Sequence, residues 1–144
     1  MGSKFGENNI TAKILIAVNV RQSEYKSHLN KATDFYQGMK LSEDKGLWHS
    51  TGLNAVHCAI SLSDALTIYY LSKRFSGDDH KQASELLSRI PIEGVAQQAH
   101  NFKRIILKKH MIAYEEREFR KSEAAEIAQQ TERFYRWGVS QLSQ

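Results

Sequence analysis

The chain contains one proline, Pro91, and only eight glycines in 144 residues. Small all-β proteins need many tight turns, and these two residue types supply a large share of them. Long uninterrupted helices are therefore the more economical prediction, because few positions would break them. With 41% apolar and 25% charged residues, a chain of this length also suits a single globular domain with a real core.

Apolar residues recur at helical spacing from Tyr25 onward. The first stripe proceeds in steps of four and three residues, as one face of a long helix requires: Tyr25, Leu29, Ala32, Tyr36 and Met39. The same pattern predicts helices over 53–74, 80–90, about 95–116 and about 122–142. We therefore expect an all-α fold, an up-and-down antiparallel four-helix bundle with one short additional helix.

Several residues carry signals for the ends of these helices. Gly77 is suited to the left-handed conformation that often follows a helix. Asp79, with Gln82 three positions later, has the spacing of a capping box for the short helix. Ser122 is expected to cap the last helix. These signals predict where the helices begin and end.

The N-terminal part of the chain is set apart from the periodic region. Residues 1–20 are predicted to be a tail or arm, with 10–20 suiting either the start of a helix or an extended segment. Residues 21–144 form the predicted domain. Cys58 is the single cysteine, and the sequence has neither a secretory signal nor a run of about 20 apolar residues. The expectation is a reduced cytoplasmic protein with no membrane association.

Basic residues are concentrated between positions 101 and 110. The chain carries 20 Lys and Arg against 16 Asp and Glu, a net charge of +4. Within the ten residues there are four bases and no acid: Lys103, Arg104, Lys108 and Lys109. A phosphate-bearing partner such as RNA or a nucleotide would fit this pattern. Solvation of an ordinary helix face would account for it as well.

Two segments place five residues between an arginine and a histidine: Arg104 with His110, and Arg74 with His80. A metal-free ribonuclease needs an arginine to hold the phosphate and a histidine as acid or base, both at the scissile group. On one straight helix, Arg104 and His110 lie about 120° apart, so they meet only through a helix distortion or a two-fold partner. A glycine-containing loop would have to join Arg74 to His80, and helix-end electrostatics explain that pair equally well.

Other polar residues give weaker indications. His57 and Asp64 are seven residues apart and share a helix face, which favours a polar interhelical or dimer contact. Lys109 falls on the apolar arc of the 95–116 helix, so its stem should be packed. The six histidines are scattered without the spacing of a metal site, and neither a metal nor a cofactor is predicted.

Three sequence motifs resemble the HEPN superfamily, the nucleotide-binding domains of higher eukaryotes and prokaryotes, and in particular a small stand-alone subgroup. They are the stretch "AVHCAISLSDA", the "DDH" that opens the short helix, and Lys109 with Tyr114 as K-x4-Y. The likeness covers residues from about 21 to 142. It implies a four-helix bundle, usually dimeric, whose members include metal-independent endoribonucleases with an R-x4-6-H motif.

The resemblance assigns expected roles to particular residues. Arg104 and His110 match the R-x4-6-H motif as phosphate clamp and acid or base, with Arg74 and His80 as the alternative pair. RNA or phosphate contacts are expected from a further set: Lys103, Lys108, Lys109 and Tyr114. Other members of the family are non-catalytic. This chain would then be an interaction module that docks with a nucleotidyltransferase or with a toxin or antitoxin partner.

Overall fold

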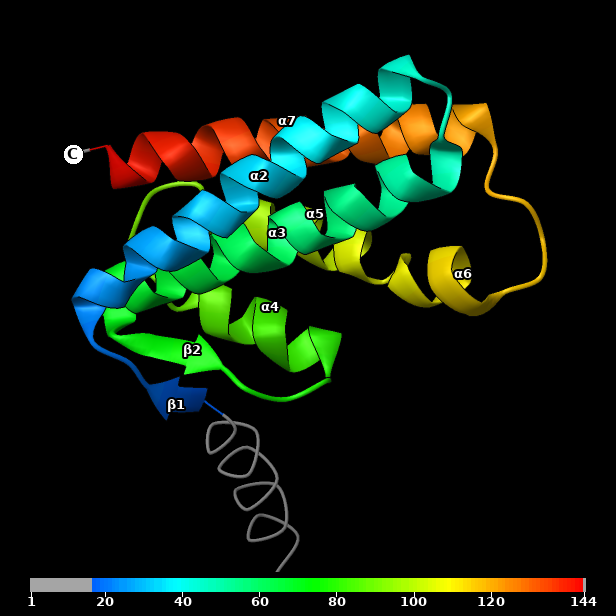
Figure 1. Cartoon of the computed structure of the whole chain (residues 1–144). Coiled ribbons are helices and arrows are strands. Elements are labelled where there is room, and N and C mark those ends of the chain that lie inside the picture. The colour runs from blue at the N-terminus through cyan, green and yellow to red at the C-terminus, as the bar shows by residue number, and fades with distance from the viewer. Residues whose placement is uncertain (1–16, 144) are drawn as a thin grey trace, which may run out of the picture.

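The computed structural model describes residues 17–143, and these are mostly helical, as predicted (Figure 1). The predicted tail therefore lies outside the described residues up to position 16. The elements in chain order are β1 (Ala17–Asn19), η1 (Gln22–Glu24), α2 (Tyr25–Asp44), α3 (Trp48–Leu71), β2 (Lys73–Phe75), α4 (His80–Ser88), α5 (Val95–Ile106), α6 (Lys109–Tyr114) and α7 (Lys121–Leu142).

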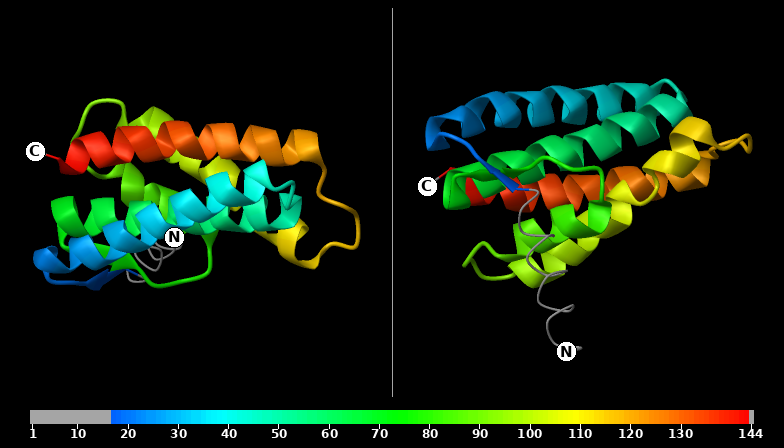
Figure 2. Two further views of the ribbon diagram at one scale, coloured as in Figure 1. Left: turned by 45° about the horizontal axis from the view of Figure 1, so that its top comes forward. Right: turned by 90° about the horizontal axis from the view of Figure 1, so that it is seen from below.

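Helix α3 is the centre of the molecule. It packs against α2 along a hairpin and also contacts α4, α5, α6 and α7, so that it lies between α2 and the other helices (Figure 2). Its small residues allow close approach, and Ala55 and Ala59 are fully buried. Leu62 of α3 covers Gly138 of α7, where an added Cβ would come within 2.5 Å of Leu62 Cδ2. The core therefore surrounds α3 on several sides.

Two predicted helix boundaries are confirmed. Helix α2 begins at Tyr25, where the apolar stripe starts, and its stripe residues Ala32 and Met39 are fully buried. Helix α4 follows Asp79, whose carboxylate accepts a hydrogen bond from Lys81 N at 2.9 Å. Both boundaries depend on contacts between near neighbours in the chain, which local patterns describe well.

The helix predicted over 53–74 is corrected at both ends. It begins earlier, at Trp48, and ends at Leu71, where Ser72, rather than the predicted Gly77, adopts the left-handed conformation (φ 54°). The chain then enters β2, which pairs antiparallel with β1 and sets Val18 opposite Arg74. Arg74 is thus a strand residue. The pairing joins segments more than fifty residues apart, beyond the reach of local periodicity.

The helix predicted over 95–116 is divided. Helix α5 ends at Ile106 and α6 begins at Lys109, with a turn at Leu107 and Lys108 between them. The turn redirects α6 so that Ile112 packs over Gly52 of α3, where a Cβ would come within 2.9 Å of Ile112 Cδ1. Burial of Ile112 favours this arrangement over a straight helix.

The last helix also begins earlier than predicted. Arg120, and not Ser122, precedes the first helical residue, and the Glu123 carboxylate accepts a hydrogen bond from Arg120 N at 3.1 Å. This contact satisfies one of the amides that a helix N-terminus leaves unpaired. Among the described residues, no helix combines the length and the apolarity needed to cross a bilayer.

Candidate ligand cavity between α3, α4 and α6

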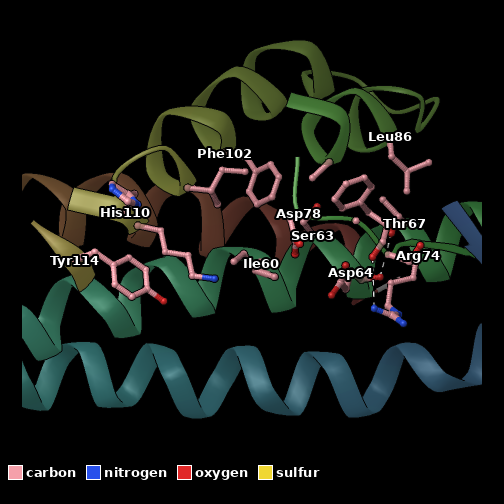
Figure 3. A pocket seen from close by; sticks show the side chains of 16 residues that line it. Ile60, Ser63, Asp64, Thr67, Arg74, Asp78, Leu86, Phe102, His110 and Tyr114 are labelled. Carbon is pink, nitrogen blue, oxygen red and sulfur yellow. Dashed lines mark hydrogen bonds between the residues drawn. The ribbon is translucent and has the colours of Figure 1, made fainter. Parts of the chain in front are cut away.

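A cavity of about 420 Å³ lies where α3, β2, α4, α5 and α6 meet. Its lining combines apolar side chains with charged ones, which is typical of small-molecule sites. Figure 3 shows His110 and Tyr114 at one end, and Asp64 and Arg74 at the other. Ile60 and the Phe102 ring lie between the two groups, so the cavity has two polar ends and an apolar middle.

The end formed by α3, β2 and the loop before α4 carries two acids, and we call it the acid end. Asp64 and Asp78 line it together with Ser63, Thr67 and Arg74. The Asp64 side chain is only 18% exposed, and its Oδ2 lies 3.9 Å from His28 Nδ1 of α2. Burial raises the pKa of Asp64 to about 7, against the opposing effects of Arg74 and Lys31. Asp64 is therefore a carboxyl group without strong stabilisation of its charge.

Arg74 reaches this end because β2 is held in place by β1. Its guanidinium donates a hydrogen bond to Phe75 O at 3.4 Å. Burial raises the pKa of Asp64 and lowers the pKa of His28, and the positive charge of Arg74 favours the lower value for both groups. Arg74 thus offsets part of the negative charge at the acid end.

Helix α6 forms the opposite end, which we call the basic end, with Lys109, His110 and Tyr114. The His110 and Tyr114 rings are 5.4 Å apart, and the Tyr114 side chain is 72% exposed at the rim. Lys109 is half-buried, as its place on the apolar arc predicted. Among the described residues, no acid lines this end. The basic end is therefore suited to an anion.

The two polar ends are separated by the apolar middle of the cavity (Figure 3). Ile60 of α3 lies between them, and Asp64 follows Ile60 by four residues, about 6 Å at a rise of 1.5 Å per residue. Burial lowers the pKa of His57 on the same helix, and the Lys109 charge lowers it further. A ligand that contacts both ends is therefore elongated.

Arg104 and His110 are not brought together within one chain. His110 lines the cavity, whereas Arg104 faces a separate groove between α5 and α7, close to Gln130 and Arg133. The cavity instead combines His110 with Arg74, one member of each predicted pair. His80 is the first residue of α4, and its side chain lies outside what the structure describes.

The remaining predicted residues lie around the cavity rather than in it. Lys108 Nζ lies 3.8 Å from Glu126 Oε1 of α7, and Lys103 is half-buried on α5. His57 packs against Phe35 of α2 with ring centroids 5.3 Å apart. His57 and Asp64 thus each contact α2, through different partners. Local patterns did not indicate Ser63, Thr67 or Asp78 as cavity residues, because the walls come from distant segments.

Comparison with known proteins gives no family to which the cavity can be related. No family model matches the sequence, and neither the curated proteins nor the solved structures gave a match. Among the side chains that the structure describes, no three His, Cys, Asp or Glu residues gather as metal ligands would. The geometry alone indicates what the cavity can hold: an elongated molecule with an anionic group at α6 and hydrogen-bond donors at Asp64.

Proposed function

We propose that this chain is a HEPN-like four-helix bundle, dimeric, that binds RNA or a nucleotide with a phosphate at the basic end of the cavity. The observation that carries the proposal is the composition of that end. Lys109 supplies a positive charge, the His110 ring supplies nitrogen atoms for hydrogen bonds, and no described acidic residue lines this end. Tyr114 at the rim offers a ring on which a neighbouring base can stack.

The acid end is a poorer place for a phosphate. Two carboxyl groups, Asp64 and Asp78, line the cavity with Arg74, and they leave no surplus of positive charge there when both are ionised. A phosphate at that end would also meet like charges at short range, which is destabilising. The electrostatics therefore give the ligand a direction, with its phosphate toward α6.

A binding experiment tests this proposal directly. Two ligands would be used, fluorescently labelled single-stranded RNA and AMP. The affinity of each would be measured for the wild-type protein and for the variants Lys109→Ala and Lys26→Ala. Lys26 is an exposed lysine on α2, so its replacement makes the same change of charge away from the cavity. We expect Lys109→Ala to weaken binding at least tenfold and to reduce its salt dependence, because one phosphate contact is lost. Equal effects of the two variants would refute the assignment.

Metal-independent RNA cleavage by a dimer is the second candidate. Arg104 and His110 are both exposed on either side of the turn between α5 and α6, and Leu107 in that turn is 57% exposed. A two-fold partner that covers Leu107 would bring its own Arg104 toward His110. The site would then contain one residue from each subunit, which a single chain does not provide.

Mixing two inactive variants tests this shared site. Cleavage of pooled RNA in excess EDTA would be measured for Arg104→Ala, His110→Ala and a refolded equal mixture. If each site combines Arg104 of one subunit with His110 of the other, the mixture regains about a quarter of wild-type activity, from random pairing in a two-fold dimer. A mixture as inactive as either variant would refute the shared site. A wild type that neither binds nor cuts RNA would leave the interaction module as the better hypothesis.

A further inference from the structure

The acid end of the cavity has properties that phosphate binding at α6 does not use. Asp64 is a largely buried carboxyl group on the most extensively packed helix, and its contact with His28 at 3.9 Å is too long for a hydrogen bond. The Asp64 side chain lines the cavity, where a ligand could supply a hydrogen-bond donor that the carboxylate does not receive from His28. Asp64 is therefore available to accept a hydrogen bond from a bound molecule.

The donor that Asp64 requires must lie at the far end of a ligand whose phosphate is at α6. Asp64 and the α6 residues line opposite ends of the cavity, with Ile60 and Phe102 forming an apolar middle (Figure 3). A nucleotide has this arrangement, because its phosphate and the outer edge of its base lie at opposite ends of the molecule. Adenine and cytosine carry an amine donor on that edge, whereas uracil has a carbonyl acceptor there.

We propose that Asp64 accepts a hydrogen bond from the exocyclic amine of a nucleotide base whose phosphate is held by Lys109 and His110. The cavity then selects amine-bearing nucleotides over those with a carbonyl at the same position. This inference rests on the proposed function and adds to it the identity of the base edge. A carbonyl oxygen against the Asp64 carboxylate would leave two acceptors face to face, which gives selectivity by repulsion as well as by attraction.

The groups around Asp64 support this role. His28 and Lys31 approach it from α2, Arg74 from β2, and Asp78 lies in the loop before α4. The positive charges of Arg74 and Lys31 favour the ionised carboxylate, while burial opposes it. An amine donor from the ligand also favours the ionised form, so amine selectivity should increase as the pH rises through 7.

The experiment compares two pairs of nucleotides that differ at the exocyclic group and at the ring nitrogen beside it. AMP and IMP, and likewise CMP and UMP, differ by an amine against a carbonyl, and their affinities would be measured by calorimetry at pH 6 and pH 8. At pH 8 we expect the amine-bearing member of each pair to bind about tenfold more tightly, equivalent to about 1.4 kcal/mol. Asp64→Asn should remove or invert the preference, because an amide donates to a carbonyl. Asp34→Asn, which makes the same change at an exposed site on α2, should leave the preference intact.

Each outcome separates this inference from the proposed function. If all four nucleotides bind equally well to wild type and Lys109→Ala weakens all four, only the role of Asp64 is refuted. If Asp64→Asn weakens all four by the same factor, Asp64 merely maintains the cavity and the inference is again refuted. If none of the four binds wild-type protein at millimolar concentration, the role of Asp64 is refuted, and the labelled-RNA measurement decides the proposed function. The wild-type comparison needs no variant, so misfolding of Asp64→Asn cannot obscure the result.

Discussion

Replacing Gly138 by alanine should destabilise the protein, although alanine is the better helix former. Gly138 is buried within α7, and an added Cβ would lie 2.5 Å from Leu62 Cδ2 and 2.9 Å from Leu62 Cγ. Leu62 is itself fully buried in α3, so its side chain cannot swing into solvent to make room. The helices must separate or Leu62 must leave its preferred rotamer, and either response costs free energy.

The expected magnitude follows from two opposing effects. Alanine gains about 1 kcal/mol of helix propensity over glycine. Overpacking a close-packed core costs about 1–3 kcal/mol, and a contact this short belongs at the upper limit. The net loss is about 2 kcal/mol in the free energy of unfolding, or roughly 6 °C in melting temperature for a domain of this size. Urea denaturation and thermal melts followed by circular dichroism would measure both quantities.

Two control variants make the test decisive. Gly38→Ala, in α2, gains the same propensity but meets only the end of the Asn54 side chain, at 3.0 Å. It should therefore be close to neutral or slightly stabilising. Leu62→Ala combined with Gly138→Ala should be more stable than the sum of the single effects predicts, because the contact is relieved. A Gly138→Ala variant as stable as Gly38→Ala would refute the close packing of α3 on α7.

Burial raises the pKa of Cys58 to about 12, so the native protein should react with a thiol reagent at pH 8 only on unfolding, and a rate independent of urea would contradict this. The hydrogen bond from Arg117 at 2.7 Å is the main reason that the pKa of Glu123 is lowered to about 2. Its stabilising effect is present above pH 4.5 and is lost toward pH 2, so in urea titrations the deficit of Glu123→Gln at pH 7 should vanish at low pH. Asp64 is the opposite case, because its raised pKa makes folding less favourable as the pH rises from 3.8 to 7. Asp64→Asn should therefore be the more stable protein at pH 8, by no more than about 4 kcal/mol, and should match wild type near pH 4.

Local patterns in the sequence predicted the helical class and the helix starts that depend on near neighbours. Tyr25 and Asp79 mark boundaries whose determinants lie within four residues, and the structure confirms both. The division between α5 and α6 has no such marker, because Leu107 and Lys108 are both good helix formers. The packing of Ile112 over Gly52, sixty residues away, accounts for the turn. The same turn leaves Ala113 of α6 exposed.

The residues that line the cavity were harder to predict from the sequence than the helices were. Arg74 enters it through a strand pair with Val18, and a strand of three residues leaves almost no periodic signal. An interhelical contact was predicted for Asp64, and its Oδ2 indeed lies near His28 of α2, but its exposure to the cavity depends on β2 and α4. Charge patterns drew attention to the 101–110 segment, yet they did not reveal that Lys109 and Arg104 would face different grooves.

The division between α5 and α6 also has a kinetic consequence. Helix α6 comprises six residues, Lys109–Tyr114, so it retains few internal backbone hydrogen bonds, whereas the 24 residues of α3 are anchored on several sides. Amide protons of α6 should therefore exchange with solvent through local opening long before those of α3. A ligand that links the two elements would slow exchange selectively in α6. Part of the binding free energy of the ligand would then be used to order α6. A covalent cross-link within α6 should therefore increase the affinity without any new contact to the ligand.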